Sequence, residues 1–149
     1  MNFDGLTVEQ ISARLMQGNA PLMNAMGCKG IQAHDAQAHT LRMAFEVRPE
    51  FCHSGGRIAQ GGFVTAWLDA AMAHLVIVES KGRENVASLE IKVSFVAAAS
   101  PGPVVAHARI LKKGRRVAFL AADLYDKDER LLASATSTAL LTEMHRPGA

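Results

Sequence analysis

A pair of glycines and one carboxylate are the residues of this sequence best placed to do chemistry. Gly61 and Gly62 follow Gln60, and Asp69 comes next in an apolar run without Gly or Pro. Glycines let a ligand approach the backbone closely, and the first turn of a helix has N–H groups without intrahelical partners. Such groups can hold the carbonyl oxygen that becomes an oxyanion in acyl transfer. The alternative is a flexible turn that leads into a helix.

Asp69 is a charged residue within a segment that is predicted to be a buried helix. Burying a carboxylate costs several kcal/mol unless it has partners or a task. One interpretation is a structural aspartate that is bonded to a Ser or Thr of a neighbouring sheet. The other is a general base or nucleophile. The residue alone leaves both interpretations open.

The spacing of Gly62 and Asp69 adds a constraint. Seven residues of helix place them on one face but about 10 Å apart along the axis. A reacting carbonyl must lie about 3 Å from its oxyanion donor and close to its attacking group. Two antiparallel copies of the helix can meet both conditions, with Gly62 of one copy facing Asp69 of the other. The spacing therefore predicts a site shared within a homodimer, or within a dimer of dimers.

The elements that position these residues follow from periodicity. Thr7 is a candidate N-cap for a short helix over residues 7–16, which residues 19–21 should end. A long helix is expected over residues 61–80, apolar around its circumference and therefore buried. Strands are expected at residues 26–34, 39–47, 88–96, 104–111, 117–125 and 131–141, the last four as an antiparallel meander. The order predicts an α+β hotdog fold, in which a curved antiparallel sheet of about six strands wraps one helix.

Composition limits the class of protein. The chain has 149 residues, 49% of them hydrophobic, which predicts a single globular domain over residues 1–149. A net charge of +2 and 5% aromatic residues argue against nucleic acid as a partner. We expect no membrane partner, because Asp69 and His74 interrupt the best apolar run before it reaches about eighteen residues. Cys28 and Cys52 lack metal-site spacing, and the N-terminus is polar, so we expect no metal and a cytoplasmic location.

The stretch QGGFVTAWLDAAMAHL resembles the HGG…D signature of the PaaI-like hotdog-fold acyl-CoA thioesterases. The similarity extends over roughly residues 38–141 and includes a basic hairpin. The resemblance implies hydrolysis of acyl-CoA thioesters without a cofactor, because coenzyme A is part of the substrate. It implies that Asp69 is the general base or nucleophile and that Gly62, beside Gly61, polarises the thioester carbonyl through its N–H. It also implies that Ser88 orients Asp69 or a water molecule.

The chain departs from the family pattern at two places. Gln60 stands where the family has His, and it could still bond the carbonyl or support the loop. Many members carry an Asn six residues before the glycine pair. Here either Ser54 or, with a longer loop, His53 fills that position.

The basic hairpin has two interpretations. Its tip, KKGRR, holds four cations, and an exposed turn of this kind is common. The functional interpretation is contact with the phosphates of coenzyme A. These cations are Lys112, Lys113, Arg115 and Arg116.

The remaining candidates have structural interpretations as well. Met23, Met26 and Met72 could line an acyl pocket or fill the core. Trp67 is expected in the core, and His74 in the core or an interface.

Two alternative functions stay open. One is a non-catalytic acyl-CoA-binding module, which as a sensor would need a DNA-binding domain. The other is a hydratase or dehydratase, whose chemistry usually pairs a His with the acid. The sequence does not identify the acyl group or distinguish coenzyme A from a carrier protein.

Overall fold

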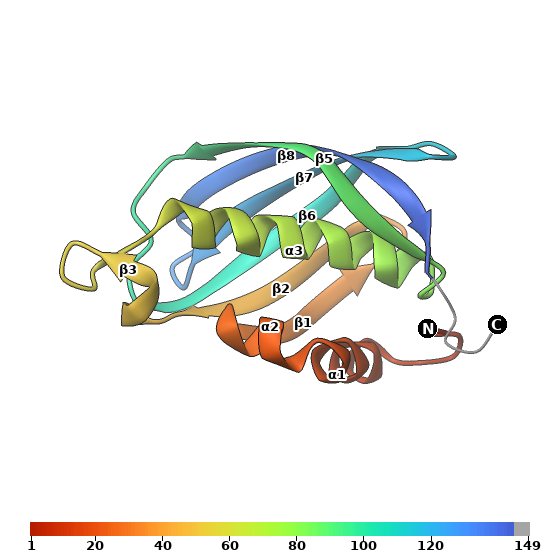
Figure 1. Ribbon diagram of the computed structural model, residues 1–149, viewed down its shortest axis with the longest axis horizontal. Helices are drawn as coiled ribbons and strands as arrows, with labels where there is room; N and C mark the ends of the chain where they lie inside the picture. The colour runs from red at the N-terminus through yellow and green to blue at the C-terminus, as the bar shows by residue number, and fades with distance from the viewer. Residues whose placement is uncertain (145–149) are drawn as a thin grey trace.

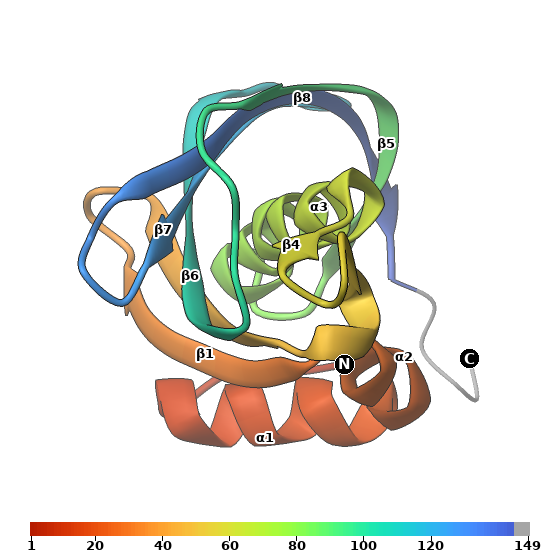
Figure 2. The ribbon, with the colours of Figure 1, turned by 90° about the vertical axis from the view of Figure 1, so that its left-hand side faces the viewer.

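A long central helix surrounded by one curved sheet forms the body of the molecule. The computed structural model describes residues 1–144, so residues 145–149 of the predicted domain lie outside the described part. Helix α3 (Gly61–Glu79) runs inside a six-stranded antiparallel sheet, as both views of the ribbon show (Figures 1 and 2). The predicted fold class is confirmed.

Two short helices precede the sheet. Helix α1 (Val8–Gly18) begins after Thr7, whose side chain and that of Gln10 form a capping box. Residues 19–21 do not end the helical region as predicted, because α2 (Ala20–Ala25) follows at once. Its first turn contains Pro21, a position where the missing N–H costs nothing. Both helices lie outside the sheet, beneath β1 (Figure 2).

The sheet contains all six predicted strands in the order β1-β2-β6-β7-β8-β5. Their bounds are β1 Cys28–Asp35, β2 Thr40–Val47, β5 Glu84–Phe95, β6 Gly102–Lys113, β7 Val117–Asp126 and β8 Leu131–Glu143.

The predicted meander is wrong at its first strand. Strand β5 pairs with β8 rather than with β6, so it is an edge strand. The connection over residues 96–101 is long enough to cross from one side of the sheet to the other. Its path is fixed by backbone hydrogen bonds from Val96 and Ala97 to Leu132 and from Ala59 to Ala99.

A small unpredicted hairpin leads into α3. The 3-10 turn η1 (Pro49–Phe51) is followed by the two-residue strands β3 (Cys52–His53) and β4 (Ile58–Ala59). These strands are too short to leave a periodic pattern in the sequence. They bring residues 52–59 next to the first turn of α3.

One side of α3 forms the centre of the core. Trp67, Leu68 and Leu75 are fully buried, and the Trp67 Nε1–H donates to the Met26 carbonyl over 2.8 Å. By length and a mean hydropathy of 1.5, α3 could cross a membrane, which corrects the expectation that no run is long enough. The sheet surrounds it, so α3 serves as the core helix of this fold.

The other side of α3 is more open than predicted. Ala66, Asp69, Ala70 and Ala73 are only half-buried, because no strand covers the helix between β5 and α2. The carboxylate therefore lies on the open face of the helix and is not enclosed by the sheet.

Candidate active site

The start of α3 is capped by its own preceding residue. The Gln60 side-chain Oε1 accepts a hydrogen bond from the Gly62 N–H over 2.6 Å. This N–H is the predicted oxyanion donor, and in this structure it already has a partner. A carbonyl oxygen can use the donor only by taking the place of the Gln60 amide oxygen.

An apolar pocket lies beside this first turn. Its volume is about 340 Å³, and its lining includes His53, Gly61, Val64 and Phe95. A Cβ atom at position 61 would lie 3.1 Å from the ring of Phe95, which is closer than ordinary contact. Glycine at this position therefore lets the aromatic ring cover the helix start.

Asp69 is held by the edge strand. The Ser88 Oγ–H donates to Asp69 Oδ1 over 2.8 Å, and Ser88 lies on β5. Within residues 1–144 the other carboxylate oxygen, Oδ2, accepts no hydrogen bond. The serine thus fixes the orientation of the carboxylate and leaves one oxygen available.

The two halves of the predicted site lie apart in one chain. Gly62 and Asp69 belong to one uninterrupted helix, so about 10 Å separates them along its axis. The structure brings Ser88 to Asp69 and Gln60 to Gly62, but it does not bring one pair to the other. Among the described residues no cluster of His, Cys, Asp or Glu is arranged to hold a metal ion.

Comparison with known proteins places this arrangement in a family. A family model described as the thioesterase superfamily matches residues 57–133, which include the capped helix start, Asp69 and Ser88. The chain belongs to the thioesterase superfamily. A search of curated proteins found no match.

Solved structures share the fold of this superfamily member. A phenylacetic acid degradation-related protein from Ralstonia eutropha is 28% identical, with a TM-score of 0.75 over 86% of this chain and 97% of that one. A thioesterase from Haemophilus influenzae is 16% identical, with a TM-score of 0.80 over 99% and 98%. The PaaI protein of E. coli is 14% identical, with a TM-score of 0.75 over 91% and 96%. These findings confirm the predicted resemblance and support thioester hydrolysis as the general activity.

The two candidates for the family's Asn position are neighbours in this thioesterase-superfamily chain. His53 Nδ1 and Ser54 Oγ lie 2.9 Å apart, and both side chains are exposed. Only His53 is among the residues that line the pocket beside the helix start. Ser54 has a φ of 54°, which turns the loop away after His53.

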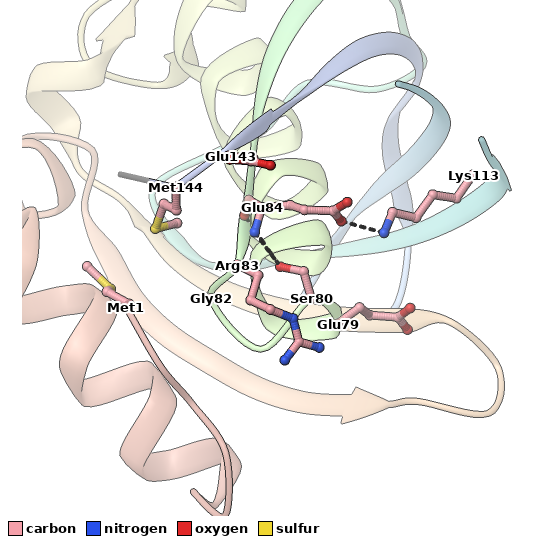
Figure 3. A pocket seen from close by; sticks show the side chains of 9 residues that line it. All are labelled: Met1, Glu79, Ser80, Gly82, Arg83, Glu84, Lys113, Glu143 and Met144. Carbon is pink, nitrogen blue, oxygen red and sulfur yellow. Dashed lines mark hydrogen bonds and ion pairs between the residues drawn. The ribbon is translucent and has the colours of Figure 1, made fainter. Parts of the chain in front are cut away.

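The basic hairpin lies at the opposite end of α3 from Gly62. Lys113 is bound to Glu84 on β5, in a pocket that also holds Arg83 (Figure 3). Lys113 is therefore partly neutralised, which the sequence pattern did not indicate. Lys112, Arg115 and Arg116 form no ion pair with any residue that the structure describes.

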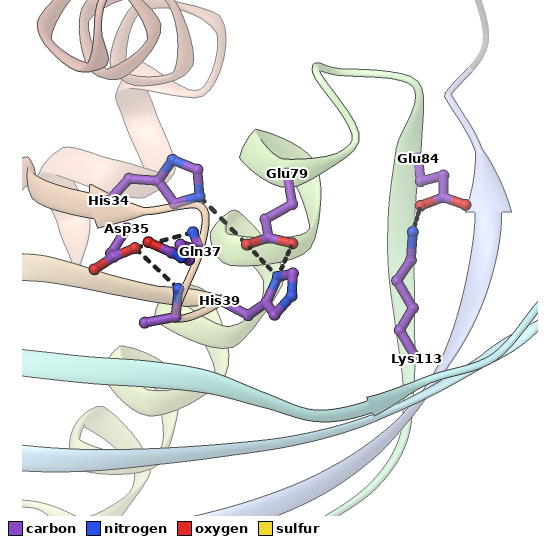
Figure 4. A network of polar contacts seen from close by, with 8 residues as sticks. His34, Asp35, Gln37, His39, Glu79, Glu84 and Lys113 are labelled. Carbon is purple, nitrogen blue, oxygen red and sulfur yellow. Dashed lines mark hydrogen bonds and ion pairs between the residues drawn. The ribbon is translucent and has the colours of Figure 1, made fainter.

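A second polar network ties the same end of α3 to the β1–β2 turn. The Glu79 carboxylate contacts His39 Nδ1 at 2.9 Å and His34 Nε2 at 3.4 Å (Figure 4). No sequence pattern indicated this network, because forty or more residues separate the partners. It fastens the end of α3 away from the candidate site.

Sequence reasoning also missed the groove beside Asp69. A groove of about 470 Å³ lies between the open face of α3 and the helices α1 and α2. Its lining includes Met23 and Met26, two of the predicted pocket residues, whereas Met72 is buried in the core. It also includes His74, which is buried as predicted yet reaches the groove. The unpredicted helix α2 supplies one wall, so no sequence signal placed these residues together.

Proposed function

We propose that the protein hydrolyses acyl-CoA thioesters, with Asp69 as general base or nucleophile. The observation that carries the proposal is the Ser88–Asp69 hydrogen bond, which orients the carboxylate and leaves Oδ2 available. With Asp69 as base, a water molecule gives a proton to Oδ2 while its oxygen bonds to the thioester carbon. The carbon–sulfur bond then breaks, and the coenzyme A thiolate leaves and takes up a proton.

The site is completed by a second copy of the chain. Strand β5 is paired on one side only, and its exposed residues include Leu89 at 61% and Phe95 at 59%. A long unpaired edge with apolar side chains favours pairing with the same strand of another copy around a two-fold axis. Because Ser88 ties Asp69 to this strand, the carboxylate lies next to the proposed interface. The dimer can then bring Gly62 of the partner subunit to Asp69.

The substrate carbonyl replaces the Gln60 side chain at the helix start. In the free protein Gln60 Oε1 accepts from the Gly62 N–H. The carbonyl oxygen takes over this hydrogen bond, which strengthens as negative charge develops on the oxygen. Gln60 therefore keeps the donor satisfied between turnovers, and its amide is free to contact the bound thioester afterwards.

The nucleotide of coenzyme A contacts the basic hairpin. Arg115 and Arg116 are exposed, and their guanidinium groups suit bidentate contact with phosphate. The hairpin lies near the C-terminal end of α3, about ten residues or 15 Å along the helix axis from Asp69, so an extended pantetheine arm can bridge the distance. The proposed reaction uses no metal or bound cofactor, because coenzyme A is part of the substrate, and we propose a cytoplasmic location for it.

A thiol-release assay over a panel of acyl-CoAs tests this proposal. We expect turnover by the wild-type protein and a decrease in kcat of at least ~100-fold in Asp69→Asn, which preserves size but removes basicity. Unchanged turnover in this variant would remove Asp69 from the mechanism. If no acyl-CoA releases thiol while a titration shows binding, the protein is a binding module. Hydration of an enoyl-CoA without thiol release would indicate a hydratase.

A further inference from the structure

Strand β5 contains one extra residue where it pairs with β8. Ser88 lies opposite Ala139, and Glu90 lies opposite Thr138, the residue that directly precedes Ala139 on β8. Two steps along β5 therefore match a single step along β8. This is a β-bulge, and its extra residue is Leu89, whose side chain is exposed.

The bulge decides which side chains of β5 face α3. Side chains alternate between the two faces of a regular strand, so Ser88 and Ile91, three residues apart, should lie on opposite faces. In the structure Ser88 reaches Asp69 on α3. Ile91 and Val93 pack against the core around the same helix. The extra residue makes both arrangements possible, because a shift of one residue exchanges the faces of a strand. In a regular strand, either Ser88 would turn away from Asp69 or Ile91 would leave the core.

A buried serine on β8 holds this bulge. Ser137 is 2% exposed, and its Oγ–H donates to the Glu90 carbonyl oxygen over 2.7 Å. Glu90 comes directly after the extra residue, Leu89. A regular register would shift Glu90 by one residue along β8 and break this hydrogen bond. The Ser137 hydroxyl therefore stabilises the bulged register of β5 relative to a regular one.

We propose that Ser137 is a positioning residue for Asp69. Its hydroxyl holds the bulge, the bulge turns Ser88 toward α3, and Ser88 orients the carboxylate. The proposal rests on the proposed function, in which Asp69 acts on the thioester. Ser137 contacts the backbone of β5 and not the substrate, so loss of its hydroxyl should lower kcat by misaligning the carboxylate and leave KM nearly unchanged.

The first test is a double-variant cycle on Ser137 and Ser88. For one acyl-CoA that the wild type hydrolyses, kcat and KM are measured for Ser137→Ala, Ser88→Ala and the double variant. We expect Ser137→Ala to lower kcat by about tenfold with KM within about twofold of the wild type. The double variant should be no slower than Ser88→Ala, because a residue that acts through Ser88 has no effect once Ser88 is gone. Decreases in kcat that multiply in the double variant, or an unchanged kcat in folded Ser137→Ala, would overturn the proposal.

Two further variants separate positioning from folding. Ser80→Ala removes the other buried serine hydroxyl of residues 1–144, which donates to the Ile77 carbonyl at the end of α3. This variant should lose stability as Ser137→Ala does and keep the wild-type kcat. Ser137→Cys keeps the volume of the site and donates only weakly, so it replaces Ser137→Ala if that variant does not fold. A wild-type kcat in Ser137→Cys would then contradict the proposed role.

The second test does not depend on turnover. The carboxyl carbon of Asp69 is observed by NMR in ¹³C-aspartate-labelled protein, with Asp69→Asn used to assign the signal. Ser88→Ala removes the hydrogen bond and should move this signal. The Ser137 variants should move it in the same direction, whereas Ser80→Ala should leave it in place. If the signal responds in this way but no thioester is hydrolysed, the positioning role stands and the proposed function fails. If hydrolysis depends on Asp69 but neither kcat nor the signal responds to Ser137, the positioning role is wrong and the proposed function stands.

Discussion

Leu68 and Asp69 are consecutive residues on the two faces of α3, and their surroundings differ sharply. Leu68 is fully buried against the sheet, whereas Asp69 is half-buried, bonded to Ser88 and open to a groove. Successive helical residues are about 100° apart, so one step along the chain passes from the core to the candidate site. The difference indicates that the sheet-facing side of α3 stabilises the fold and that the open side carries the chemistry.

The largest expected effect tests the sheet-facing side. Leu68→Ala removes buried methyl groups and leaves a cavity, so the free energy of unfolding should fall by about 3 kcal/mol. Urea denaturation measures this change, and Asp69→Asn is the matched control. The control should change the free energy of unfolding by less than about 1 kcal/mol, since asparagine can still accept from Ser88. A loss in Asp69→Asn as large as that in Leu68→Ala would make Asp69 a structural residue.

The second prediction tests whether the open face works across two chains. Asp69→Asn and Gly62→Val should each be inactive, and equimolar subunit exchange should restore about a quarter of the wild-type activity. Half of the dimers are then mixed, and each mixed dimer has one site with both residues intact. A Cβ atom at position 62 would lie 2.7 Å from Gln60 Oε1. This atom is the flexible end of a side chain, so the variant can fold by displacing it.

The control for the exchange experiment is each variant exchanged with itself, which should remain inactive. Circular dichroism and gel filtration establish that both variants are folded and of the same size. If exchange of folded variants restores no activity, Asp69 and Gly62 do not share a site, and Asp69 must act within its own chain.

The faces of α3 also show what could be predicted from the sequence. The strands were predictable because alternating apolar and polar residues mark a half-buried strand. The role of Thr7 as the N-cap of α1 was predictable because the capping pattern is local. The position of β5 was not predictable, because short-range turn signals do not say which distant strand pairs with an edge. In the structure β5 pairs with β8, and Ser88 on β5 contacts Asp69. In the predicted meander, β5 would have paired with β6 instead.

From the residues alone, the candidate site was predictable only where its parts are close in the sequence, and the role of Ser88 came from the family resemblance. Gly62 and Asp69 were found from their spacing, yet the hydrogen bond between Gln60 and Gly62 was missed. That bond depends on the side-chain conformation of Gln60, which composition does not reveal. The groove and His74 were missed because they require α2, a helix that begins where Asn19 and Pro21 suggested an end.

The third prediction extends the comparison to the end of α3. The double variant Arg115→Ala, Arg116→Ala should raise KM for an acyl-CoA several-fold and leave KM for the matching acyl-N-acetylcysteamine thioester nearly unchanged. The difference should shrink as salt increases, because exposed charges are screened. Lys29→Ala, Lys127→Ala removes the same net charge from exposed positions elsewhere and is the control. Equal effects on both substrates would mean that the hairpin does not hold the nucleotide.

The smallest expected effect is a change in how steeply the free energy of unfolding depends on pH. It tests whether His74 is held neutral in the folded protein. Burial lowers the pKa of His74 from its ordinary value of 6.5. Between the lowered pKa and about 6.5 the unfolded chain binds a proton that the folded chain does not, so the free energy of unfolding decreases as pH falls. His74→Met should remove up to about 1.4 kcal/mol per pH unit of this decrease in that window and none above it. Urea denaturation from pH 7.5 downward measures the slope, and a smaller slope should remain, because the pKa of His107 is also lowered by burial. Identical slopes in both proteins would mean that the folded chain binds a proton at His74 as readily as the unfolded chain does, so burial would not keep the ring neutral.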